Sequence, residues 1–206
     1  MPVPTSDLPL IGDANGQYRV QLVGNSGVGK STTGLRLART LNVPFISLDT
    51  LHWAPDWVER DGDEFRARVR STLDVAEKEQ GGWVVDGNYL RHLADIMAER
   101  RTDVVWLDPP LALYLPRLIW RTISRSLGLG AEQCSLGCKE SLGRALFTSD
   151  SIIWWCITHH RSVREREEAR MSTMGVQVGG IMRRIGGWGK ELEMWMERVQ
   201  QLVRHK

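Results

Sequence analysis

Residues 24–31 read Gly-Asn-Ser-Gly-Val-Gly-Lys-Ser, a complete G-x-x-x-x-G-K-S phosphate-binding loop. The loop follows an apolar run at 18–23 and opens a segment with helical periodicity, which is the context that the motif requires. Its glycines let backbone N–H groups turn inward and form a nest for an anion at a helix N-terminus. The loop therefore predicts an α/β fold that binds the phosphate groups of a nucleotide.

The chemistry of this loop assigns a role to each polar side chain in it. We expect Lys30 to reach the β and γ phosphates of ATP and to act in catalysis, and the Ser31 hydroxyl to ligate Mg²⁺. ATP and Mg²⁺ are therefore the expected cofactors. The predicted nucleotide-binding residues are Gly24, Asn25, Ser26, Gly27, Val28, Gly29, Lys30, Ser31 and Thr32.

Short apolar runs alternate with helical segments along the rest of the chain, a pattern typical of a parallel sheet with helices on both faces. The expected strands are 18–23, 44–48, 83–85, 104–107 and 176–181. The expected helices are 30–41, 63–79, 89–100, 116–127, 150–171 and 190–206, with Pro116 as a first-turn residue. Residues 1–206 form one expected domain, because no repeat or low-complexity linker divides them.

Two segments stand outside this alternation. Residues 1–16 are predicted to be a flexible tail, without the basic and apolar regions of a secretory signal. Residues 126–149 are rich in Gly and Ser and have no clear period, so we predict a lid-like insertion there.

Composition excludes several classes of protein. A chain that is 42% hydrophobic and 25% charged is not disordered, and no run approaches the ~20 apolar residues of a membrane helix. Three cysteines are too few for a disulfide framework, which favours a reducing, cytoplasmic location. The formal net charge of +2 gives no general attraction to nucleic acid, so we expect small-molecule partners and no membrane.

Carboxylates end three of the expected strands. Asp86 and Asp108 occupy positions where such folds hold the water shell of Mg²⁺, although either residue could instead cap a helix or begin a turn. Asp49 follows the second strand, where a general base for a hydroxyl acceptor would lie. His52 and Trp53 next to it are acceptor-binding candidates or core packing residues, and Trp57 could extend an aromatic wall.

Arg117, Arg121 and Arg125 recur every four residues on one helix face, with no acidic residue between 111 and 131. Three like charges on one stripe destabilise a helix unless an anion compensates them, so we expect them to contact phosphate in catalysis. The alternative is a solvated surface.

Two other kinds of site have weaker support. Cys134, Cys138, Cys156 and His159 have a spacing that a zinc ion could use, but the second pair lies in an apolar stretch that favours helix packing. A Ser–His–Asp hydrolase has no G-x-S-x-G motif to support it.

The phosphate loop, LDTLHWAPDW at 48–57, WVVDGNY at 83–89 and DVVWLDPP at 103–110 together resemble the adenylate-kinase-like P-loop kinases. The resemblance is strongest to the branch labelled DNA topology modulation protein or FlaR-like, and it covers about residues 18–160. It implies a P-loop NTPase fold with a five-stranded parallel sheet of order 2-3-1-4-5 and a lid. It also implies phosphoryl transfer from ATP, with Asp86 near the metal and the arginines clamping the transferred phosphate. Cys138-Lys139-Glu140 resembles the Cys-Pro-Glu lid element of that branch.

The acceptor is less constrained than the donor. Adenylate kinases carry Asp-Gly-Phe-Pro-Arg, whereas here the fifth position is Leu90 and Arg91 falls one residue late. The LDTLHW element is also similar to gluconate- and shikimate-type kinases, whose second strand ends in an acceptor-binding Asp. The expected acceptor-binding residues are Asp49, His52, Trp53, Asp86, Asn88, Tyr89 and Arg91, and the expected metal ligands are Ser31 and Asp86.

The leading interpretation is an ATP- and Mg²⁺-dependent kinase acting on a nucleoside monophosphate or a small hydroxyl metabolite. The alternatives are a slow ATPase that regulates a partner, with nucleic acid as one such partner, and a metabolite-binding domain with a vestigial loop. The sequence leaves the oligomeric state and the pathway open.

Overall fold

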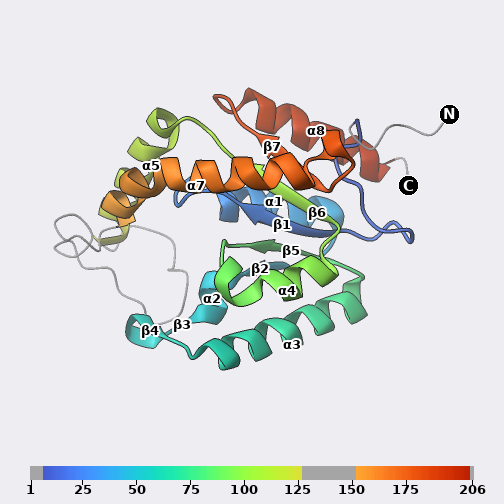
Figure 1. Cartoon of the computed structure of the whole chain (residues 1–206), viewed down its shortest axis with the longest axis horizontal. Coiled ribbons are helices and arrows are strands. Elements are labelled where there is room, and N and C mark those ends of the chain that lie inside the picture. The colour runs from blue at the N-terminus through green and yellow to red at the C-terminus, as the bar shows by residue number, and fades with distance from the viewer. Residues whose placement is uncertain (1–6, 127–151, 205–206) are drawn as a thin grey trace.

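The computed structural model describes residues 7–126 and 152–204. Its centre is a five-stranded sheet of order β2-β5-β1-β6-β7, in which every neighbouring pair is parallel (Figure 1). Numbered along the chain within this sheet, the order is 2-3-1-4-5, which confirms the predicted fold. The strands are β1 Arg19–Val23, β2 Phe45–Ser47, β5 Trp83–Asp86, β6 Asp103–Leu107 and β7 Met182–Ile185.

Helices cover both faces of the sheet (Figure 1). One face packs against α1 and α8, and the other packs against α3 and α4 toward β2 and against α7 toward β7. Alternate residues of a strand therefore enter different cores: Val84 faces α1 and α8, whereas Trp83 and Val85 face α3 and α4. The long helices are α1 Lys30–Leu41, α3 Gly62–Gln80, α4 Leu90–Arg100, α5 Leu111–Ser126, α7 Ile152–Met174 and α8 Lys190–Arg204.

Short elements fill the connection between β2 and α3. They are α2 Leu48–His52, β3 Trp53–Ala54, the 3₁₀ turn η1 Pro55–Trp57 and β4 Val58–Glu59, and β3 pairs with β4 antiparallel. This small hairpin projects from the carboxyl end of β2, on the same side of the sheet as the phosphate loop (Figure 1).

The predicted position of the fifth strand was wrong. Residues 176–178 form the 3₁₀ turn η2 Val176–Val178, the chain turns at Gly179 with φ 82°, and the strand follows at Met182–Ile185. Two arginines hide this strand from a hydropathy pattern. Arg183 is buried and donates to Leu8 O at 2.7 Å, and Arg184 lies 4.7 Å over the ring of Trp106.

The start of α5 was also predicted wrongly, because Pro116 lies inside the helix and does not begin it. The helix starts at Leu111, directly after Pro109 and Pro110, and Leu113 N donates to Pro110 O at 2.9 Å. Pro116 lies just beyond the first turn and removes one backbone hydrogen bond there. The other predicted helices agree with the structure to within three residues, as far as it describes them.

The N-terminal segment is not a loose tail where the structure describes it. Leu10 is 1% exposed in the core shared with α8, and Trp195 Nε1 donates to Pro9 O at 2.9 Å. The backbone N–H groups of Ile11 and Gly12 donate to the two carboxylate oxygens of Asp103 at 2.7 and 3.0 Å. An apolar Leu-Pro-Leu-Ile run therefore anchors residues 8–12, and the flexible-tail expectation fails for them.

Of the predicted lid at 126–149, only Ser126 lies within the described residues, as the last residue of α5. Among the described helices, none is both long and apolar enough to cross a membrane.

Candidate active site

The phosphate-binding loop joins the carboxyl end of β1 to the first turn of α1, as the sequence predicts. Gly24 has φ 139°, and a Cβ there would lie 2.4 Å from Leu107 O on the neighbouring strand. Gly29 has φ 97° and immediately precedes α1. Both positions require glycine, the first for close approach and both for the backbone conformation. The loop can therefore direct its N–H groups toward an anion at the helix N-terminus.

Lys30 lies folded over this loop. Its Nζ donates to Gly24 O at 3.1 Å and to Asn25 O at 2.9 Å. Burial lowers the pKa of Lys30, and the nearby carboxylates of Asp86 and Asp49 oppose that shift. The ammonium group is thus positioned at the mouth of the loop, where phosphate oxygens would replace its carbonyl partners.

Ser31 and Asp86 meet beside Lys30. Ser31 Oγ donates to Asp86 Oδ2 at 2.6 Å, and Asp86 is 4% exposed at the end of β5. Its other oxygen, Oδ1, is buried and has no hydrogen-bond partner among the described residues. Burial raises the pKa of the Asp86 carboxyl. A hydroxyl and a carboxylate with an unsatisfied oxygen fit the oxygen coordination that Mg²⁺ requires.

Asn88, expected on the acceptor side, contacts the phosphate loop. Its Nδ2 donates to Gly24 O at 2.7 Å, and its Oδ1 accepts from Gly24 N at 3.2 Å. This reciprocal pair fixes the start of the loop to the turn that follows β5.

The predicted acceptor residues of α2 gather around an aromatic cluster. Tyr89 OH donates to Asp49 Oδ1 at 2.6 Å. His52 is 4% exposed, and its ring lies 4.8, 4.8 and 4.6 Å from the rings of Trp53, Phe65 and Tyr89. The cluster forms one wall beside the Asp49 carboxylate.

His52 carries its own polar contacts within that wall. Its Nε2 lies 3.3 Å from Glu59 Oε1 on β4, and its Nδ1 is buried without a hydrogen-bond partner among the described residues. Burial lowers the pKa of His52, which favours the neutral ring. Trp57 extends the wall, with its ring 5.8 Å from that of Trp53, whereas Arg91 is exposed on the first turn of α4.

Two of the predicted arginines of α5, Arg117 and Arg121, lie near the phosphate loop. Arg117 lines a small pocket with Val28 of the phosphate loop and Gly186 of the turn after β7. Arg121 is exposed, and its positive charge acts on Lys30 to lower the pKa of that ammonium group further. The side chain of Arg125 lies outside the described residues.

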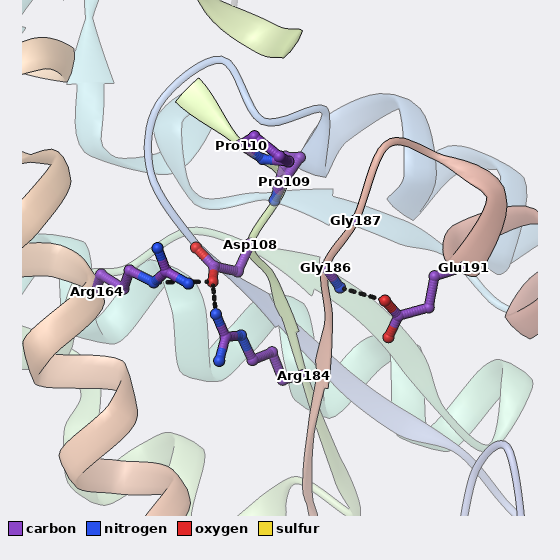
Figure 2. Close-up of a pocket in the computed structure, with 8 residues that line it drawn as sticks. All are labelled: Asp108, Pro109, Pro110, Arg164, Arg184, Gly186, Gly187 and Glu191. Atoms are coloured by element: carbon purple, nitrogen blue, oxygen red, sulfur yellow. Dashed lines mark hydrogen bonds and ion pairs between the residues drawn. The ribbon is translucent and has the colours of Figure 1, made fainter. Parts of the chain in front are cut away.

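Asp108, considered for the metal shell, for a helix cap or for a turn, is held by two arginines. Its Oδ2 accepts from Arg164 Nε of α7 at 3.2 Å and from Arg184 NH2 of β7 (Figure 2). These residues line a pocket of about 400 Å³ with Pro109, Pro110, Gly186, Gly187 and Glu191. Asp108 therefore ties α7 to the edge of the sheet.

The zinc alternative gains no support from the described part of the chain, which has no group of three or more potential ligands. Cys156 is buried, with its Sγ 3.5 Å from Ser26 O, whereas His159 is exposed and stacks on Trp155. Cys134 and Cys138 lie outside the described residues.

Sequence reasoning missed Tyr114 and His160 behind the loop, and the contacts that Asn25 and Cys156 make there. Asn25 Nδ2 donates to Tyr114 OH of α5 at 3.0 Å and to Cys156 O of α7 at 2.9 Å, and Tyr114 OH lies 2.9 Å from His160 Nδ1. The sequence signal that could have found this group is Tyr114, an aromatic residue with a polar hydroxyl on the apolar face of α5.

Comparisons with known proteins match this chain to a family of kinases. The family model for shikimate kinase matches residues 26–168. A shikimate kinase from Sulfurihydrogenibium sp. (strain YO3AOP1) is 34% identical over 108 residues, which is 48% of this chain and 65% of that relative. The match thus spans just under two thirds of the curated relative.

Two solved structures share the fold at low sequence identity. A gluconokinase from Sinorhizobium meliloti 1021 has a TM-score of 0.52 at 14% identity, covering 92% of this chain and 95% of its own. Shikimate kinase from Acinetobacter baumannii in complex with shikimate has a TM-score of 0.51 at 18% identity, with the same coverage. The family model covers well over half of the sequence and begins inside the phosphate loop, and on that match the chain belongs to the shikimate kinase family.

Proposed function

We propose that this protein transfers a phosphoryl group from ATP to a hydroxyl group of a small metabolite, with Mg²⁺. The observation that carries the proposal is the convergence of Lys30, Ser31 and Asp86 at the mouth of a complete phosphate loop. An ammonium group, a hydroxyl and a carboxylate in that arrangement are the components that phosphoryl transfer needs on the donor side.

On the donor side, the loop N–H groups and Lys30 bind the β and γ phosphates. Ser31 and Asp86 would hold Mg²⁺, which neutralises charge on the phosphate oxygens when it is bound. Arg117 and Arg121 supply further positive charge from α5. The pocket beside Val28 and Arg117 is where the rest of the nucleotide would extend.

On the acceptor side, Asp49 accepts the proton of the attacking hydroxyl. Its hydrogen bond from Tyr89 orients the carboxylate and holds one of its oxygens, which leaves the other for the acceptor. The wall of His52 and Trp53 excludes water from the reacting hydroxyl, and competing hydrolysis of ATP is thereby suppressed.

Shikimate is the first acceptor to test, since the matched relative and one of the matched structures carry that name. A nucleoside monophosphate is the second, and gluconate is the third because of the gluconokinase fold.

Within the wider superfamily, the LDTLHW and DGNY elements support a place in the branch labelled DNA topology modulation protein or FlaR-like.

The test is release of ADP from Mg·ATP by the purified protein, measured with and without shikimate, gluconate and AMP. Turnover that rises at least tenfold with one acceptor supports the kinase and identifies that acceptor. Turnover that is equal with and without every acceptor contradicts it in favour of an ATPase that acts on a partner. Binding of ATP without turnover contradicts it in favour of a vestigial loop.

A further inference from the structure

The phosphate loop is tied from behind to two helices by a single side chain. Asn25 Nδ2 donates to Tyr114 OH of α5 and to Cys156 O of α7, at 3.0 and 2.9 Å. Asn25 Oδ1 accepts from Ser26 N at 2.8 Å, so the same amide also fixes the next residue of the loop. All three contacts are made by a residue that is buried.

Apolar packing surrounds this hydrogen-bonded junction. Tyr114, Leu118 and Cys156 form a buried cluster with Val28 of the loop. A Cβ on Gly27 would lie 3.1 Å from Leu118 Cβ, so α5 lies directly against the tip of the loop. Figure 1 shows α5 and α7 side by side at this end of the sheet.

The hydroxyl of Tyr114 is the shared group of the junction. The Asn25 amide nitrogen can only donate, so Tyr114 OH accepts from it and has its own proton left for His160 Nδ1, 2.9 Å away. Burial raises the pKa of Tyr114, which keeps the phenol protonated. Tyr114 is 1% exposed, and loss of the hydroxyl would leave the Asn25 donor with one partner fewer.

The same helix carries the cationic side chains of the donor site. Tyr114, Leu118 and Arg121 are spaced four and three residues apart and so follow one face of α5. Because Tyr114 and Leu118 are anchored on the loop, the position of Arg121 relative to Lys30 depends on that anchor. The effect of the Arg121 charge on both Lys30 and Cys156 agrees with this placement.

We propose that Asn25 and Tyr114 are positioning residues, which hold α5 on the phosphate loop so that Arg121 faces the transferring phosphoryl group. This inference rests on the proposed phosphoryl transfer. Neither residue touches the reacting atoms: the pair acts through Arg121. A guanidinium displaced by about 1 Å loses much of its effect on the rate while the loop still binds nucleotide.

The test is a double-mutant cycle between Tyr114→Phe and Arg121→Ala. Tyr114→Phe keeps the aromatic ring and removes only the shared hydroxyl. We expect it to lower kcat about tenfold and to leave KM for ATP within about threefold, since ground-state binding is retained. If Tyr114 acts through Arg121, the double variant turns over within twofold of Arg121→Ala alone. A double variant that is tenfold slower than Arg121→Ala means independent effects and overturns the proposal.

Controls separate this outcome from misfolding and from failure of the proposed activity. Tyr18→Phe removes another buried phenol hydroxyl and should leave kcat and KM unchanged. If thermal unfolding shows that Tyr114→Phe is not folded, Asn25→Ala replaces it in the cycle. If the wild-type protein releases no ADP, the proposed function fails. The same double-mutant cycle is then measured as binding affinity for ADP with aluminium fluoride, which mimics the transferring phosphoryl group. If the two single variants lose affinity additively in the double variant, the positioning role is overturned.

Discussion

Ser31 Oγ and Asp86 Oδ2 lie 2.6 Å apart, although the two residues are separated by 55 positions in the sequence. One comes from the first turn of α1 and the other from the end of β5, and the parallel pairing of β1 with β5 brings them together. The polar pair is therefore assembled by the sheet itself. It leaves Asp86 Oδ1 buried and without a partner among the described residues, at a stability cost that a bound cation would relieve.

Asp86→Asn is expected to abolish Mg²⁺-dependent turnover while stabilising the protein without ligand. Burial raises the pKa of Asp86, so the native state binds more protons than the unfolded state between the ordinary pKa of 3.8 and the folded value. The free energy of unfolding contributed by this group therefore falls as pH rises through that window and stays low above it. The gain in stability from Asn is therefore largest above the folded pKa and shrinks as the pH falls toward 3.8.

Denaturant unfolding of both proteins between pH 5 and 8 measures that gain. Asp63→Asn, at an exposed residue of α3, is the matched control for replacing one carboxylate by an amide. A variant that is less stable than the wild type at pH 7 without Mg²⁺ would contradict the assigned cost of the buried carboxylate.

Lys30→Ala is expected to keep the fold and to lower turnover by about 10²-fold or more, because charge on the transferring phosphoryl group loses its ammonium partner. Steady-state ADP release measures the loss, and circular dichroism checks the fold. Lys78→Ala, on the exposed side of α3, is the control. Turnover of Lys30→Ala within tenfold of the wild type would refute the donor-site assignment.

Arg121→Ala is expected to lower kcat about 10²- to 10³-fold, as loss of a phosphate-clamping guanidinium does. Arg121→Lys should recover only part of the rate, since a point charge does not reproduce the bidentate fork. Arg39→Ala, an exposed arginine of α1, serves as the control for loss of surface charge. Equal kcat values for Arg121→Ala and the wild type would make the arginine a solvated surface residue.

Asp49→Asn is expected to reduce acceptor-dependent turnover by about 10²-fold, within the range for loss of a general base, and to leave ATP affinity within threefold. Tyr89→Phe, which removes the 2.6 Å hydrogen bond to Asp49 Oδ1, should have a smaller effect in the same direction. Isothermal titration with an ATP analogue and acceptor-dependent kinetics separate the two quantities. Equal losses in both would assign Asp49 to the metal site or to the core.

Leu10→Ala is expected to destabilise the protein by about 2 to 5 kcal/mol, because it opens a cavity where the N-terminal segment meets α8. Leu35→Ala, an exposed leucine of α1, should cost far less. Denaturant unfolding compares the two variants. A loss below about 0.5 kcal/mol for Leu10→Ala would indicate that this segment is peripheral to stability.

Local patterns explain what the sequence could predict. The phosphate loop, four of the five strands and α1 carry their own signals, since glycines, apolar runs and helical periodicity act over a few residues. β7 carries no such signal, because Arg183 and Arg184 occupy its centre and find partners that only the fold supplies, in Leu8 O and in Trp106. The anchoring of Leu10 depends in the same way on α8 and on Asp103.

The residues of the candidate site also divide into those with a local sequence signal and those whose contacts depend on the fold. Lys30, Ser31 and Asp86 were predicted as a group because the motif and a strand end define them. The contacts of Asn25 could not be predicted, because its partners Tyr114 and Cys156 are separated from it by 89 and 131 residues in the sequence. Acceptor binding by Asn88 stays a prediction, whereas its contact with Gly24 was not predicted, because a side-chain amide after a strand can turn toward either neighbour.

The place of β1 in the sheet has a consequence for how such a protein changes over time. β1 and its loop lie between β5 and β6. Beyond β5 lies β2, which leads into α2 and the β3–β4 hairpin, whereas β6 leads into α5. Asp49 and the aromatic wall thus belong to one flank, and Arg117 and Arg121 to the other. If the proposed function holds, substitutions on the first flank would change the acceptor and leave the residues at the phosphate loop in place. One scaffold can thereby give rise to enzymes with different acceptors and a common donor.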